Sequence, residues 1–530
     1  MANVDVDVTG SSPIVSSVPD RRAGWFGLLD LPLSRGWCAF GWFSATAIFI
    51  GMLRFLGGPT ESDSPESLYS TWAVAHGHLS CAYPPSGLTH IPAVASPGPF
   101  VAPLWPLLSG VLAALARIGH AVAFPSTGAL GANCSSAYQA MFHWSFQSGA
   151  AAPTVRLGYL SVVVLTAGVV ALLRATGRGL RVWEPAALML VACVPSIWMA
   201  LLQYFHPQDI VAMGLVLGGL AGVRRGRWGW AGVLLGLAVT SQQFALLVLA
   251  PLLVVVPANR RVKFVGSAIV AAALVVVPFL VATSGRALSA VMIGSGNTKS
   301  FGGTVLWELH LHGSVLVASS RLVPIALSML LAQWALRRLG PKVLEPVPLL
   351  SLIATSLGLR LVFEQNLIGY YFMALALCLI LLDVVRGQIR GRLVAWLALL
   401  PLVFSPVPWG FVSNTVSWGF QEREFAPFLG MAVAALVIIL DVRRRRVRWY
   451  VVGWLAVVLV AFARLPWTNP PFRQPLPTWF WQIVLVLSGV ALAMRPLLAA
   501  VGDAMASHAP ETRNEVPVEM LLCDDPVSST

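Results

Sequence analysis

A run of acidic and aromatic residues early in the chain holds the densest set of side chains that could do chemistry. It contains Glu61, Asp63 and Glu66, followed by Tyr69 and Trp72. A carboxylate can act as a general base, taking the proton from an acceptor hydroxyl as its oxygen attacks. Tyr69 and Trp72 fall at helical spacing, so a helix here would place Glu66 one turn before Tyr69 and on the same face. A solvated acidic loop is the alternative interpretation.

The same stretch continues into His76, His78 and Tyr83, which we count among candidate substrate-binding residues. A His-x-His pair can supply two ligands to a metal ion. No third ligand is defined near it, so the pattern is more typical of ordinary polar histidines. We expect no cofactor and no metal site, although the sequence leaves a divalent metal open.

Two further groups of candidate binding residues follow. His206 and Asp209 stand where one apolar segment ends and the next begins, and Asp209 could instead cap the second helix. Gln242 and Gln243 interrupt the apolar run at residues 230–257. This pattern resembles a broken helix, whose freed backbone groups require a polar cavity.

A fourth group contains Arg360, Glu364, Tyr370 and Tyr371. Arg360 lies one helical turn before Glu364, so the spacing predicts an ion pair between them. Arg360 could instead hold a phosphate, because guanidinium groups bind phosphate oxygens well.

The composition indicates which elements must position these groups. The chain has 530 residues, of which 57% are hydrophobic and 11% charged, whereas soluble domains carry about 25% charged residues. We therefore predict an all-α, polytopic integral membrane protein of about 14 transmembrane helices. The predicted spans are residues 36–56, 154–173, 185–203, 209–223, 230–257 as two short helices, 264–283, 315–336, 345–363, 367–383, 393–412, 425–441, 450–464 and 478–496.

The distribution of charge predicts the orientation of these spans. The net charge is +13, but the arginines form short runs between apolar segments, which indicates cytoplasmic loops and not a nucleic-acid surface. This orientation gives a multi-pass cell-membrane protein with both termini in the cytoplasm. Residues 101–122 would invert it if they crossed the membrane. We therefore expect an interfacial or re-entrant helix there, in a long first external loop at residues 57–153.

Two other features belong to the predicted external side. Cys81 and Cys134 both lie in polar, arginine-poor loops, and whether they form a disulfide is left open. Basic residues near that face could bind an anionic substrate, and Arg360 is the first choice because it lies close to the membrane plane. The basic residues of this set are Arg286, Lys299, Arg321, Arg360, Arg423, Arg464 and Arg473.

The layout of residues 55–260 resembles the GT-C superfamily of polytopic glycosyltransferases, most closely the actinobacterial enzymes that use polyprenyl-phosphate mannose or arabinose. Three stretches carry the resemblance: the acidic loop leading through Tyr69 to Tyr83-Pro84-Pro85, the segment His206-Pro207-Gln208-Asp209, and the segment from Arg224 through Ala231-Gly232 to Thr240. In this family the base is an acidic residue just ahead of a tyrosine in the first external loop. The position four before Tyr69 is Pro65 here, and Gln242 or Gln243 replaces the family's lysine.

The resemblance implies an inverting transfer of mannose or arabinofuranose from a polyprenyl phosphate donor to an envelope glycan or glycolipid, among membrane lipids and without nucleic acid. Composition and charge predict a cytoplasmic segment 1–35, a C-terminal transmembrane module 261–501 and a disordered cytoplasmic tail 502–530, and the resemblance implies a catalytic module at 36–260. A transporter or flippase, or a non-catalytic scaffold homologue, remains as an alternative. A transporter usually shows internal repeats, and we find no second copy of the Ala-Gly segment.

Overall fold

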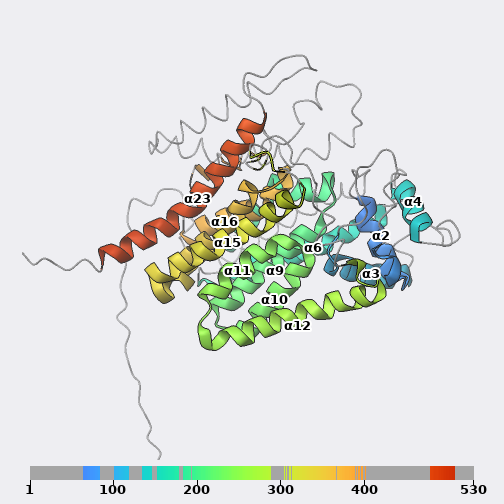
Figure 1. The fold of residues 1–530 in the computed structure, drawn as a ribbon, viewed down its shortest axis with the longest axis horizontal. Helices are drawn as coiled ribbons and strands as arrows, with labels where there is room; N and C mark the ends of the chain where they lie inside the picture. Colours follow the sequence, from blue (N-terminus) through green and yellow to red (C-terminus); the bar gives the residue numbers. More distant parts are fainter. Residues whose placement is uncertain are drawn as a thin grey trace, which may run out of the picture.

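The computed structural model describes part of the chain, in separate ranges. The described residues are 64–83, 101–118, 134–145, 152–177, 183–287 except Cys193, 313–387 except Asn366, and 478–507, with separate positions such as Phe124, His310 and Trp396. All regular secondary structure within these residues is helical, which confirms the predicted all-α class. Figure 1 shows long helices packed side by side, with shorter helices gathered at one end.

The elements follow the chain in this order. The first are α2 (Ser64–Ala75), η1 (Leu79–Cys81), α3 (Leu104–Ile118), α4 (Cys134–Ser145), α5 (Ala152–Val155), η2 (Arg156–Gly158) and α6 (Tyr159–Ala175). Next come α7 (Trp183–Ala192), α8 (Pro195–Trp198), the π-helical turn η3 (Met199–Gln203), α9 (Pro207–Arg224), α10 (Trp228–Ser241), η4 (Gln243–Ala245), α11 (Leu246–Val255) and α12 (Ala258–Ala282). The last are α15 (Gly313–Leu339), η5 (Gly340–Leu344), α16 (Pro346–Val362), η6 (Gly369–Phe372), α17 (Met373–Val385) and α23 (Thr478–Ala506).

Some of these helices are long and apolar enough to cross a membrane. Within the described ranges they are Arg156–Ala175, Ala258–Ala282, Val315–Leu344 and Gln482–Ala506. These agree with the spans predicted at 154–173, 264–283, 315–336 and 478–496, and they indicate a membrane protein. The spans predicted at 36–56, 425–441 and 450–464, nearly all of 393–412, and the segments 1–35 and 508–530 lie outside the described residues. The number of about 14 spans and the cytoplasmic termini therefore stay predictions.

The apolar stretch at residues 101–122 is described as far as Ile118, and Leu104–Ile118 form the helix α3 of 15 residues. At 1.5 Å per residue its length is about 22 Å, short of the roughly 30 Å of a bilayer core. Trp105 on α3 is buried, and a side chain at Gly110 would collide with Val74 of α2. The packing against α2 is established, and the interfacial or re-entrant placement of this helix stays a prediction.

Close contacts at glycines hold the helices α6, α9, α10 and α12 together (Figure 1). Gly168 of α6 and Gly214 of α9 face each other, so that a Cβ on either would meet backbone atoms of the other helix. Gly232 and Gly236 of α10 lie equally close to carbonyl oxygens of α12. Small residues at these positions let helix backbones approach closely, as is common in membrane bundles. The Ala-Gly segment of the sequence therefore serves helix packing.

A second group consists of α11, α15, α16 and α23, which pack in that order (Figure 1). The Ser351 hydroxyl joins α16 to α23, because it accepts a hydrogen bond from the Leu497 amide at 3.0 Å next to Pro496. α10 packs mainly in the first group and α11 mainly in the second. The break between α10 and α11, which the sequence predicts within 230–257, is thus where the chain passes from one group of helices to the other.

Candidate functional site

The break between α10 and α11 is the centre of the candidate site. Gln242 follows the last residue of α10 in an extended conformation, with φ −158° and ψ 138°. The Ser241 hydroxyl donates a hydrogen bond to the carbonyl oxygen of Gln208 at 2.8 Å, and the Gln243 amide donates to the side-chain oxygen of Gln242 at 3.0 Å. The Gln242 side chain therefore bonds a backbone N–H at the break, and Ser241 ties the end of α10 to the start of α9.

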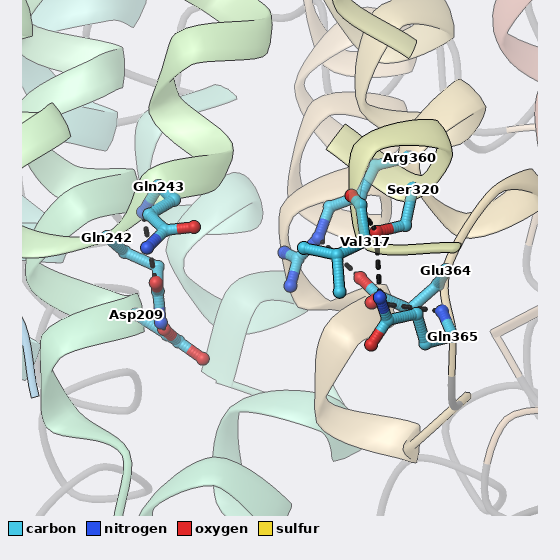
Figure 2. A network of polar contacts seen from close by, with 8 residues as sticks. All are labelled: Asp209, Gln242, Gln243, Val317, Ser320, Arg360, Glu364 and Gln365. Atoms are coloured by element: carbon cyan, nitrogen blue, oxygen red, sulfur yellow. Dashed lines mark hydrogen bonds and ion pairs between the residues drawn. The ribbon is translucent and has the colours of Figure 1, made fainter. Parts of the chain in front are cut away.

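Asp209 lies in the first turn of α9 and faces the break (Figure 2). α9 begins at Pro207, where the missing backbone N–H costs no helical hydrogen bond. Asp209 is buried, and its carboxylate accepts a hydrogen bond from the side-chain amide of Gln242. The residue at the N-cap is His206, and no side-chain capping hydrogen bond forms. The alternative in which Asp209 caps the helix is therefore wrong, and the amide from the break orients the carboxylate instead.

His206 is held by an irregular segment that precedes α9. The chain passes through the π-helical turn Met199–Gln203, and Phe205 then adopts φ of 54°, which non-glycine residues rarely take. Such backbone strain persists only where surrounding packing enforces it, and Phe205 is buried. The His206 ring stacks on Tyr370 with a centroid distance of 4.6 Å, and its Nδ1 lies 2.8 Å from Nε2 of Gln208. The strained residue Phe205 thus directly precedes His206, whose ring is held against Tyr370 of η6.

Arg360 lies in the last turn of α16, and the predicted ion pair with Glu364 is confirmed. Its Nε donates to Glu364 Oε2 at 3.0 Å. The guanidinium carbon is 5.4 Å from the ring centroid of Phe244 and 4.8 Å from that of Tyr371. Among the described residues, no oxygen accepts a hydrogen bond from either terminal nitrogen of Arg360. Figure 2 shows the guanidinium extending from α16 toward the side on which Asp209 and Gln242 lie.

The surroundings of Glu364 fix this half of the site further. The other carboxylate oxygen of Glu364 accepts from the Gln365 amide at 3.2 Å, and the Gln365 side chain donates to the Ser320 hydroxyl of α15 at 3.1 Å (Figure 2). Arg321 and Arg360 both interact electrostatically with Glu364, and Arg360 does so with Asp209. Residues from α9, the helix break, α15, α16 and η6 therefore form one polar cluster, which we call the helix-break cluster.

The acidic loop of the sequence forms a separate group, the loop helices α2, η1, α3 and α4. Cys81 and Cys134 form a disulfide, which answers the question that the sequence left open. The Tyr69 ring is buried, and its hydroxyl donates to the Cys134 carbonyl at 3.0 Å. Burial raises the pKa of Tyr69 above its ordinary value, so the phenol stays protonated and remains a donor. Tyr83 donates to the Val101 carbonyl at 2.6 Å.

Glu66 is buried in the first turn of α2. The neighbouring Ser67 hydroxyl accepts a hydrogen bond from the Trp105 indole at 3.0 Å, and Trp105 belongs to the same apolar cluster as Val211 of α9. The helix α3 contacts both α2 and α9, and Asp209 lies two residues before Val211. Asp63 and Glu61 lie outside the described residues.

The histidines of the loop helices contact aromatic rings. His76 and His78 each lie with their ring centroids 5.6 Å from that of Trp72, and His76 also meets the Phe124 ring at 5.5 Å. No group of three or more His, Cys, Asp or Glu side chains that could hold a metal occurs in the part of the chain that the structure describes.

Sequence reasoning missed several residues that complete the helix-break cluster. Phe244 and Gln208 stand beside predicted site residues, yet their types alone indicate helix core or helix start. Ser320 belongs to the predicted span 315–336, where a polar residue at membrane depth is the signal that could have found it. Its neighbour Arg321 is already a candidate for an anionic substrate because of its charge. Arg286, a candidate for an anionic substrate, instead donates to the carbonyls of Ser80 and Tyr83 and fastens η1 to the end of α12.

The chain can now be compared with known proteins. Residues 140–307, about a third of the chain, match the sequence model of a family described as glycosyltransferase family 87, a GT-C-type family. The matched region contains the start of α9 and the helix break, whereas the loop helices before residue 140 and Arg360 lie outside it. None of the curated proteins matches the chain. The family match and the apolar helices support a membrane glycosyltransferase of the GT-C type, which requires a sugar donor and an acceptor.

Proposed function

We propose that the protein transfers mannose or arabinofuranose from a polyprenyl phosphate donor to a glycan or glycolipid acceptor on the external face of the cell membrane. The match of residues 140–307 to a glycosyltransferase family carries this proposal. The Cys81–Cys134 disulfide supports the external location of the loop helices, because disulfides persist in oxidising compartments.

The helix-break cluster is the proposed binding site for the donor. A lipid-linked donor has an apolar tail in the bilayer and a charged phosphate at its surface, so its site needs basic groups near the membrane plane. Arg360 fits this role because its terminal nitrogens have no acceptor among the described residues and extend toward Asp209 (Figure 2). His206, Asp209, Gln242 and Gln243, at the opposite side, would contact the sugar.

The acidic residues of the first loop are the proposed source of the general base. Glu66, Asp63 and Glu61 remain the candidates, with Glu66 nearest to Tyr69 in sequence. As the acceptor oxygen bonds to the anomeric carbon, the bond from that carbon to the phosphate oxygen breaks and the acceptor proton passes to the carboxylate. The departing polyprenyl phosphate gains one negative charge, which Arg360 would stabilise. Attack on the face opposite the phosphate inverts the anomeric configuration.

The test uses the full chain, purified and placed in lipid nanodiscs, with synthetic polyprenyl-phosphate mannose and polyprenyl-phosphate arabinofuranose. Glu66→Gln and Asp63→Asn are compared with the wild type in an assay of labelled sugar transferred to envelope glycolipid. Loss of the general base should lower kcat by about 10²- to 10⁴-fold in one of the two variants. Full turnover in both variants would refute Glu66 and Asp63 as the base, and full turnover in Glu61→Gln as well would refute the assignment to this loop. Movement of the lipid donor across liposomes without transfer would favour the transporter alternative.

A further inference from the structure

Arg360 differs from an ordinary surface arginine in how its guanidinium is held. Phe244 and Tyr371 flank it with ring distances of 5.4 and 4.8 Å, and Glu364 accepts from Nε. Aromatic rings attract the cation but accept little from its N–H groups, so they restrict the plane while leaving the terminal nitrogens unbonded. Because Glu364 accepts from Nε, the edge that carries the two terminal nitrogens is the one left for a ligand.

The helix break provides one of these two rings. The extended residue Gln242 sends its side chain to Asp209, and Phe244, two residues later in η4, packs against Arg360. An uninterrupted helix would place residues 242 and 244 about 200° apart around one axis, without a change of helix group between them. At the break, the Gln242 side chain instead bonds Asp209 of α9, and the Phe244 ring packs against Arg360 of α16. A single turn therefore links the carboxylate half and the arginine half of the cluster.

We propose that Phe244 and Tyr371 are positioning residues that hold the guanidinium of Arg360 as a preformed fork for two oxygens of a lipid-linked phosphate. This inference rests on the proposed function, because the ligand is the phosphate of the donor or of the released polyprenyl phosphate. A fork held in one plane can bind two phosphate oxygens in parallel. Lysine at the same position would keep the charge without the planar fork.

The inference is tested by binding, which does not depend on sugar transfer. The full chain in nanodiscs is titrated with polyprenyl phosphate, phosphatidic acid and inorganic phosphate, and lipid binding is followed by native mass spectrometry. Phe244→Leu keeps an apolar side chain of similar size but removes the ring, and should weaken polyprenyl phosphate binding by about tenfold. Phe244→Tyr should bind as the wild type does, and Arg360→Lys should bind at least as weakly as Phe244→Leu.

Phe264→Leu is the matched control, because Phe264 is a buried phenylalanine of α12 that packs against α10 near Gly232. It should lower thermal stability without changing phosphate-lipid affinity. In the transfer assay, Phe244→Leu should raise the donor KM and leave kcat within about twofold, a split that general loss of folded protein would not give.

The outcomes separate the possibilities. Wild-type affinity in Phe244→Leu, or equal weakening in Phe264→Leu, would overturn the positioning role. Equal binding of phosphatidic acid and polyprenyl phosphate would show that the site does not select the polyprenyl lipid. Binding of inorganic phosphate but of neither lipid would show that the ligand is not lipid-linked. If the binding results are as expected while no sugar is transferred from any donor, the proposed function fails and the positioning inference stands.

Discussion

Arg286 follows the turn after α12, and Arg360 lies in the last turn of α16, yet the two regions around them use the charge differently. Arg286 donates to the carbonyls of Tyr83 at 3.3 Å and Ser80 at 3.1 Å, so its donors serve to fasten the loop helices to α12. Arg360 donates to Glu364 through Nε and is otherwise flanked by rings. Backbone carbonyls engage Nε and one terminal nitrogen of Arg286, whereas neither terminal nitrogen of Arg360 donates to an oxygen among the described residues.

The same contrast extends to the two regions as wholes. In the loop helices the hydroxyls of Tyr69 and Tyr83 and the Trp105 indole bond neighbouring groups of the same region, and a disulfide closes it. In the helix-break cluster, side chains from several helices meet each other, and the Arg360 guanidinium extends toward the side on which Asp209 and Gln242 lie (Figure 2). The first arrangement favours rigidity, and the second favours binding.

The largest expected effect separates the two arginines directly. Arg360→Ala should lower kcat/KM for the lipid donor by about 100-fold, because the donor phosphate would lose a charged, bidentate hydrogen-bond donor. Arg286→Ala should lower the melting temperature, since η1 loses its attachment to α12, while the donor KM changes by less than about twofold. Steady-state transfer and thermal unfolding of both variants check this. Equal losses of donor affinity in both would remove the distinction between the regions.

The next effect concerns the disulfide. Cys81→Ser combined with Cys134→Ser should destabilise the loop helices by about 2–4 kcal/mol, because the bond closes a loop with a sequence separation of 53 residues. Hydrogen exchange should increase in residues 64–83, and transfer should fall with the loss of order around Glu66. Polyprenyl phosphate binding at Arg360 should persist. Cys523→Ser controls for general effects of removing a thiol, and loss of lipid binding in the double variant would contradict the independence of the two regions.

Part of this arrangement could be predicted from the sequence. The Arg360–Glu364 pair follows from spacing within one helix, and the break follows from polar residues inside an apolar run. Both depend only on neighbours along the chain. The contact of Gln242 with Asp209 joins residues 33 positions apart, and that of Phe244 with Arg360 joins more distant ones. Phenylalanine and tyrosine in apolar segments are typical core residues, so only the packed helices show that Phe244 and Tyr371 flank a cation.

The roles of the loop residues show the same limit. Cys81 and Cys134 could be singled out as a pair because both occupy polar loops, but their pairing required the contact between η1 and α4. Arg286 had the same charge and predicted side as Arg360, and the sequence favoured Arg360 only because it lies close to the predicted membrane plane. The difference arises from what surrounds each guanidinium after folding, namely two carbonyls in one case and two rings in the other.

A smaller effect is expected from the hydrogen bond that orients Asp209. Gln242→Leu removes the amide donor from a buried carboxylate and should lower kcat by about tenfold, in line with the loss of one hydrogen bond to a charged group. Polyprenyl phosphate affinity should change little, because Gln242 lies on the side of the cluster opposite Arg360. Gln333→Leu on α15 is the control, because it makes the same substitution outside the helix-break cluster. A parallel loss of lipid affinity in Gln242→Leu would show that the two halves do not act separately.

The smallest effects compare one hydroxyl from each region. Thr71 of α2 meets the Ser109 hydroxyl of α3 at 2.8 Å, and Ser320 accepts from Gln365 at 3.1 Å. Thr71→Val should cost about 1 kcal/mol of unfolding free energy and leave donor KM and kcat unchanged, because the bond only joins two loop helices. Ser320→Ala should leave the melting temperature nearly unchanged and raise donor KM about twofold, because Gln365 adjoins the carboxylate that holds Arg360. Thermal unfolding and donor titration of the two variants check this. An altered donor KM in Thr71→Val, and not in Ser320→Ala, would contradict the comparison between the two regions.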